Sequence, residues 1–205
     1  MLRPDQQTTY AGQVEERDKR RIGEQLEPGG RPKAPGRLEL LQRFINTHNH
    51  DFPADWDRLG TRTKAQSWLR AKGLLAPGER VSAADAKRLR EVRETLRALV
   101  AANRDGTPPA RVPPAAAVRI VVNDAGRTQL EPAGDSPAER VAAALLTIVH
   151  EARVSGEWAR MKACRNCEYA FFDRSKNRSA TWCDMSICGN RTKNRAYYRR
   201  RRAQR

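Results

Sequence analysis

The sequence lacks the features that mark membrane proteins and the common enzyme classes. Its longest aliphatic run, residues 141–146, is far shorter than the ~20 residues of a membrane-spanning helix. The N-terminus has no apolar segment of the kind found in signal peptides. No nucleophile elbow, phosphate-cradling loop, dinucleotide fingerprint or H-E-x-x-H motif is present. We therefore expect a cytoplasmic protein that has no membrane partner and is not an enzyme.

Cysteine is also scarce, and its placement is informative. The four copies lie within the last 42 residues in the pattern C-x2-C-x15-C-x4-C, as Cys164, Cys167, Cys183 and Cys188. Cytosolic thiols stay reduced, so the paired spacing favours a metal site over two disulfides or over cysteines that merely sit in a core. Four thiolates complete the tetrahedral shell of Zn²⁺ and leave no open position. The sequence thus predicts one structural, non-catalytic zinc ion.

Acidic residues are scarce in the same segment. Residues 160–205 hold 14 basic and 3 acidic side chains, which gives +11 of the formal net charge of +16. Charge concentrated in this way indicates a dedicated basic module and not a generally basic surface. Such a module attracts polyanions, and nucleic acid is the first partner to consider.

A basic helix is expected directly after the last cysteine. Residues 189–202 contain no proline and fit a helix of about 14 residues. Arginine and asparagine make bidentate contacts with guanine and adenine, and arginine also binds phosphates. The loop of residues 173–179 adds cations suited to a DNA backbone. The alternative is a solvated basic tail. The candidate nucleic-acid-binding residues are Arg174, Lys176, Arg178, Arg191, Lys193, Asn194, Arg195, Arg199 and Arg202.

The whole sequence predicts an α+β fold in three parts. Residues 1–36 are rich in breakers without apolar periodicity, which predicts a disordered arm. Residues 37–159 predict a mostly helical body with a small β-hairpin or sheet, and residues 160–205 a treble-clef-like zinc finger that ends in the basic helix. Within the body, apolar spacing predicts helices near residues 38–45 and 63–72, and capping boxes predict two further helices that begin at residues 82 and 136. A hairpin is predicted from residues 118–122 and 127–131.

The C-terminal segment resembles the CGNR zinc-finger family. The resemblance rests on Cys188-Gly189-Asn190-Arg191, on residues 171–177 and on residues 182–185. This chain has Ala180-Thr181 where the family often has a basic pair, so the resemblance implies that phosphate contacts there come from elsewhere, for example from Arg178.

The body resembles the ABATE domain that usually precedes this finger. The matching stretches are Phe44-Ile45-Asn46-Thr47, Trp68-Leu69 followed by Gly73-Leu74, and residues 89–99. Members of this family are regarded as stress-induced transcription regulators, and the resemblance implies the same role for this chain.

These observations favour a transcription regulator whose zinc finger binds double-stranded DNA on the nucleoid. The ABATE-like body would be a sensor for a small-molecule effector, or a module that forms a homodimer. Two alternatives stay open. The finger could bind RNA or protein as an adaptor, or the body could be a small-molecule enzyme with a targeting finger, in which case residues 48–51, with two His and one Asp, would line its pocket.

Overall fold

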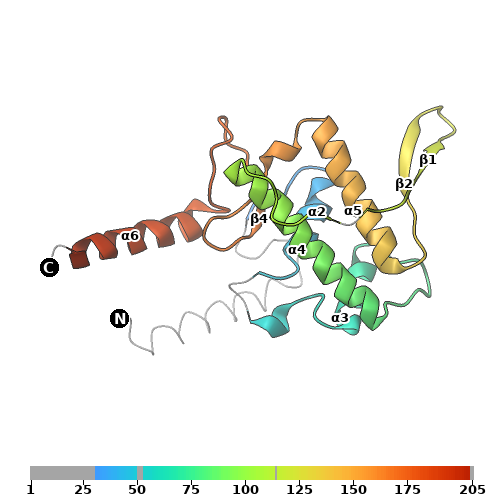
Figure 1. Cartoon of the computed structure of the whole chain (residues 1–205), viewed down its shortest axis with the longest axis horizontal. Coiled ribbons are helices and arrows are strands. Elements are labelled where there is room, and N and C mark those ends of the chain that lie inside the picture. The colour runs from blue at the N-terminus through green and yellow to red at the C-terminus, as the bar shows by residue number, and fades with distance from the viewer. Residues whose placement is uncertain (1–30, 50–52, 114, 204–205) are drawn as a thin grey trace. The chain divides into compact units, whose positions relative to one another are not determined.

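Four helices pack together in the larger part of the fold (Figure 1). They are α2 (Leu38–Ile45), α3 (Arg62–Ala71), α4 (Ala83–Asp105) and α5 (Pro137–Val154). The computed structural model describes residues 31–49, 53–113 and 115–203. The predicted disordered arm, residues 1–36, lies outside the described residues except for 31–36.

Two capping boxes fix where the long helices begin. At α4 the Ser82 hydroxyl accepts from the Asp85 N–H, and the Asp85 carboxylate accepts from the Ser82 N–H. Ser136 and Glu139 form the same reciprocal pair at α5. Both boxes were predicted from the sequence and are confirmed. Gly106 then ends α4 in the left-handed conformation, with φ of 65°, which costs glycine little because it has no Cβ.

The short helix α2 lies at the centre of this group. Leu38, Leu41, Phe44 and Ile45 recur at helical spacing and are all buried. They face α4 and α5, and the Phe44 ring meets the ring of Trp68 from α3 edge to face, with centroids 5.8 Å apart. The C-terminal end of α2 is thereby held in the middle of the body, where it contacts the start of the finger.

The predicted hairpin of the body is confirmed. Strand β1 (Val118–Val122) pairs antiparallel with β2 (Thr128–Pro132), and Ile120 lies opposite Leu130. Strand β2 contacts α5. The side chains of Val118, Ile120 and Val122 alternate along β1 and are exposed, so one apolar face of the hairpin is open to solvent.

A second hairpin opens the finger and packs on the body. Strand β3 (Met161–Ala163) pairs antiparallel with β4 (Ala170–Phe172), and β3 lies against α4. Met161, Ala163 and Ala170 belong to the same buried apolar cluster as the four helices. The first hairpin of the finger is therefore part of the core of the body.

The chain then passes through a π-helical turn, η3 (Met185–Gly189), into α6 (Asn190–Ala203). This confirms the predicted basic helix and, with the two small antiparallel sheets, the predicted α+β fold class. Short 3-10 turns occur at Ala54–Trp56 (η1) and Trp158–Arg160 (η2). Among the described residues, none of the helices is long and apolar enough to cross a membrane.

Candidate metal centre and nucleic-acid interface

The four cysteine sulfurs meet in one buried cluster and form the site of one structural zinc ion. All four lie within 4.8 Å of one another. The Sγ atom of Cys188 is 3.5 Å from that of Cys167 and 3.7 Å from that of Cys183, and the latter two are 3.7 Å apart. A tetrahedral shell with Zn–S bonds of ~2.3 Å places sulfurs ~3.8 Å apart, whereas a disulfide joins them at ~2.05 Å. The cysteines are free thiols, so the geometry fits zinc and excludes the two-disulfide alternative.

The first pair of ligands sits on the turn between β3 and β4. The Glu168 N–H donates to the Cys164 carbonyl at 2.9 Å, and the Cys164 N–H donates to the Tyr169 carbonyl at 2.9 Å. Glu168 takes a left-handed conformation, with φ of 57°, which is uncommon for a residue with a side chain. This tight turn aims the sulfurs of Cys164 and Cys167 at the same point.

The second pair is attached directly to α6. Asp184 caps the turn η3 by accepting the Ile187 N–H at 3.0 Å, and Cys188 lies one residue before the turn ends. A Cβ added to Gly189 would lie 2.5 Å from the Met185 Sδ and 3.4 Å from a Trp182 ring carbon. The last zinc ligand therefore lies in the turn that leads directly into α6. Because Gly189 has no Cβ, this turn can pack closely against Met185 and Trp182.

A small apolar shell surrounds the sulfurs. Tyr169 and Phe171 are buried in the same cluster as the cysteines, and Trp182 packs against it half-buried.

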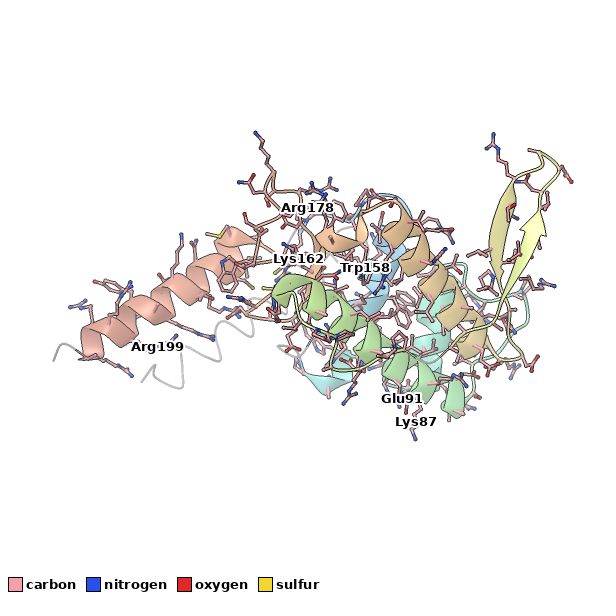
Figure 2. All side chains as sticks on the ribbon, turned by 45° about the horizontal axis from the view of Figure 1, so that its top comes forward. Lys87, Glu91, Trp158, Lys162, Arg178 and Arg199 are labelled. Carbon is pink, nitrogen blue, oxygen red and sulfur yellow. The ribbon has the colours of Figure 1, made fainter. Side chains whose placement is uncertain are left out.

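A buried carboxylate organises the basic loop of residues 173–180. Asp173 is fully buried and accepts hydrogen bonds from the Lys162 Nζ at 2.8 Å, the Ser175 N–H at 2.9 Å and the Ala180 N–H at 3.0 Å. The Lys162 Nζ also donates to the Arg178 carbonyl. Figure 2 shows Lys162 within the finger and Arg178 on the loop above it. The loop is thus tied at several points and presents its cations from a fixed backbone.

Charge pairing keeps Asp173 ionised in spite of its burial. Burial alone would raise its pKa, but the hydrogen bonds from Lys162 and Ser175 outweigh this effect and lower the pKa below its ordinary value. Arg160 adds two more hydrogen bonds from its Nη1 atom, to the backbone carbonyls of residues 173 and 175.

The predicted nucleic-acid-binding residues lie on this loop and on α6. No residue of α6 is buried. Eight of the nine candidates are exposed, and Arg191 is half-buried at the start of the helix. Arg199 stands on the outer part of α6 in Figure 2. The structure thus groups the candidates on two neighbouring elements of the finger, although their contact with nucleic acid stays a prediction.

Two polar side chains, one in α2 and one at its C-cap, form hydrogen bonds with the finger. Asn46 donates from Nδ2 to the Ala170 carbonyl at 2.9 Å, and its Oδ1 accepts the Ala170 N–H at 2.9 Å. Gln42 is fully buried and donates to the same carbonyl at 3.2 Å, while its Oε1 accepts the Ala34 N–H. These contacts occupy the edge of β4 that does not face β3.

Arg97 of α4 makes a second connection between body and finger. Its Nη2 donates to the carbonyls of Ile45 and His48 at 2.7 Å each, and its Nη1 donates to the carbonyl of Glu168 at 3.0 Å. Glu168 directly follows the zinc ligand Cys167. A single buried guanidinium therefore joins the end of α2, the segment after it and the first zinc turn.

The polar segment after α2 is only partly described. His50 and Asp51 lie outside the described residues. Thr47 and Asn49 are buried, and the Thr47 hydroxyl donates to the Phe44 carbonyl at 2.8 Å. Thr47 also accepts from Arg93, which forms a bidentate ion pair with Asp57 at 2.6 and 3.0 Å. The described part of this segment is a tightly bonded structural turn.

Sequence reasoning did not identify the residues that hold the site in place. These are Gln42, Asn46, Arg97, Lys162 and Asp173. A weak signal existed for Asn46 and Asp173, because each lies inside a stretch that carries the family resemblance. Nothing in the sequence pattern paired them with their partners.

Comparison with known families matches this architecture. The model of the CGNR zinc finger matches residues 160–201, and the ABATE model, described as "Putative stress-induced transcription regulator", matches residues 38–164. Both expected resemblances are confirmed. The two matches overlap on β3 and the first zinc ligand, the region where finger and body share a core. A search of curated proteins found no match.

Proposed function

We propose that this chain, which belongs to the ABATE family and carries a CGNR zinc finger, is a transcription regulator that binds double-stranded DNA through that finger. The observation that carries the proposal is the set of exposed cations on two elements attached to the zinc site, α6 and the loop of residues 173–180. Cations on an anchored frame lose less conformational entropy on binding than cations on a free tail.

In this proposal α6 is the element that enters a groove. It has 14 residues and a length of ~21 Å, and the major groove of B-DNA is wide enough for a helix. The N-terminal residues of a recognition helix are those that reach base edges, which assigns base contacts to Arg191 and Asn194. Lys193, Arg199 and Arg202 bind phosphates, and they release counterions when they do so.

The loop supplies the second set of phosphate contacts. Arg174, Lys176 and Arg178 are exposed on a backbone that Asp173 holds from within. Phosphate contacts fix register and orientation on the duplex but carry no sequence information themselves. The loop thus positions the finger while α6 reads the sequence.

The body is proposed to regulate the finger and to mediate dimerisation. Val118, Ile120 and Val122 form an exposed apolar row on β1, a surface suited to a second copy of the chain, and two-fold DNA sites favour dimers. An effector bound beside His48 would act on the finger through Arg97, which bonds to both sides. The proposal places the protein in the cytoplasm on nucleoid DNA and gives it no catalytic step.

Genome-wide mapping of bound sites tests the function, with Cys188→Ser as the matched control. We expect discrete sites for the native chain and their loss in the variant, because Cys188 is a zinc ligand and the last residue but one before α6. Enrichment that survives the substitution would contradict a mechanism centred on the finger. Competition between duplex DNA and structured RNA tests the alternative, since preferential displacement by RNA would favour an RNA-binding adaptor.

A further inference from the structure

One side chain connects the sulfur cluster to α6. Asn166 lies between the first two zinc ligands, Cys164 and Cys167. Its Nδ2 donates to the Cys188 Sγ at 3.6 Å, and its Oδ1 accepts from the Arg195 Nη1 at 3.2 Å. The same amide therefore touches the zinc ligand just before α6 and a side chain within α6.

The chemistry of the partners fixes the orientation of this amide. A zinc-bound thiolate carries no proton and can only accept, so the NH₂ group of Asn166 must face it. A guanidinium can only donate, so the amide oxygen must face Arg195. Neither partner could form its hydrogen bond with the flipped amide. Asn166 therefore forms a bridge between the Cys188 sulfur and the Arg195 guanidinium in one orientation only.

The bridge matters because it contacts α6 beyond the turn from which the helix starts. None of its residues is buried, and its main contacts among the secondary-structure elements are with the preceding turn, η3. Arg195 lies seven residues beyond Cys188, about two helical turns along the axis. A hydrogen bond at that point resists bending of the helix about its attachment at Gly189.

We propose that Asn166 is a positioning residue that transmits the metal-bound arrangement of the sulfurs to α6, and that Arg195 is a brace for the helix instead of a reader of DNA bases. The proposal rests on the proposed function, in which α6 binds DNA. It assigns Arg195 a role different from that of Asn194, its neighbour, which keeps an exposed side chain for base contacts.

Three substitutions separate the two halves of the bridge. Asn166→Ala removes both hydrogen bonds. Asn166→Asp still accepts from Arg195 but cannot donate to sulfur, and it places a negative charge beside the thiolates. Arg195→Ala removes only the contact with the helix. Arg165→Ala is the matched control, because it neighbours Asn166, is exposed, and loses the same charge as Arg195→Ala.

Two measurements on the full-length zinc-loaded chain test the proposal without DNA. The first is hydrogen exchange of the backbone amides of residues 192–200, and the second is the rate of zinc transfer to a chelator. We expect Asn166→Ala to speed both the hydrogen exchange and the zinc transfer. Asn166→Asp should speed zinc transfer by about 10-fold and leave hydrogen exchange in α6 as it is in the native chain. Arg195→Ala should speed hydrogen exchange and leave zinc transfer unchanged. Arg165→Ala should match the native chain in both. The proposal would be overturned if hydrogen exchange in α6 were as slow in Asn166→Ala as in the native chain. It would also be overturned if Asn166→Asp transferred zinc at the native rate.

A third measurement connects the brace to binding. Duplex DNA affinity should fall in Asn166→Ala, which changes no charge, and by more in Arg195→Ala than in Arg165→Ala. If hydrogen exchange and zinc transfer respond as expected but neither the native chain nor any variant binds DNA, the proposed function is wrong. The positioning of α6 by Asn166 and Arg195 would then still hold. If Asn166→Ala binds DNA with native affinity, the role of Asn166 in positioning α6 for DNA is wrong.

Discussion

Asn46 and Ala170 are 124 residues apart in the sequence and pair as if they belonged to neighbouring strands. The amide of Asn46 bonds to both the N–H and the carbonyl of Ala170, at 2.9 Å each. Ala170 lies in β4, opposite Ala163 of β3, and its backbone groups point away from β3 toward α2. A side chain of the body thus forms the two hydrogen bonds that a neighbouring strand would form with Ala170 at this edge of the finger's sheet.

Asn46→Ala should destabilise the whole chain and not the finger alone. It leaves the Ala170 N–H buried without its partner, and an unsatisfied buried polar group costs about 1–3 kcal/mol. We expect the free energy of unfolding to fall by about 2 kcal/mol in urea denaturation at fixed zinc concentration. Gln129→Ala, on the exposed hairpin of the body, is the control and should change it by less than ~0.5 kcal/mol. A loss confined to signals from the finger would show that body and finger unfold separately.

Asp173→Asn should disorder the basic loop and weaken the proposed DNA binding although Asp173 is itself buried. The substitution removes the charge that pairs with Lys162 inside the finger, and breaking a buried pair costs about 3–5 kcal/mol. We expect weaker binding to any duplex sequence, because the contacts proposed for the loop are with the DNA backbone. The measurement is duplex affinity by fluorescence anisotropy, compared with Asp124→Asn on an exposed turn. Native affinity in Asp173→Asn would contradict the organising role of this carboxylate.

Stability at acid pH should depend on Asp57. Burial alone would raise its pKa, but the hydrogen bonds from Arg93 and from the Leu59 N–H outweigh this and lower it below the ordinary value. A carboxyl whose pKa is lower in the folded than in the unfolded state stabilises the fold above the unfolded pKa of ~3.9 and loses that contribution as the pH falls through the folded pKa. Asp57→Asn should therefore reduce the difference in unfolding free energy between pH 6 and pH 3. An identical pH profile in native chain and variant would contradict this assignment.

Removal of zinc should unfold only part of the finger. Met161, Ala163 and Ala170 lie in the core of the body, whereas η3 and α6 have the sulfur cluster as their anchor. Because metal binding supplies folding free energy to such small modules, we expect chelation to speed hydrogen exchange in residues 181–203. The amides of β3 and β4 should keep their protection. Loss of protection throughout the four helices of the body would show instead that zinc stabilises the whole fold.

Local signals made the fold largely predictable, while the contacts that hold the site were not. Ser82 with Asp85 and Ser136 with Glu139 mark helix starts within three residues, and the cysteine spacing specified the metal site. The partner of Asn46 is 124 residues away, so no local pattern could reveal it.

The same reason applies to the basic residues of the finger. Lys162 and Arg195 both count as positive charge in the sequence. The structure places Lys162 in a buried ion pair with Asp173 and joins Arg195 to Asn166. Composition reports how many cations a module has, but only packing decides which of them are available to a phosphate.

The salt dependence of binding to duplex DNA tests the central claim most directly. The claim is that cations of a zinc-anchored helix neutralise phosphates, so the logarithm of the association constant should fall linearly with the logarithm of salt concentration. In the triple variant Lys193→Gln, Arg199→Gln, Arg202→Gln the slope should decrease in magnitude by about 2.7, since each phosphate contact contributes about 0.9. The control removes three exposed cations of the body, Arg80, Lys87 and Arg111, by the same change to glutamine, and should keep the native slope. A flat salt dependence of the native chain, or equal slopes for the two triple variants, would contradict the account.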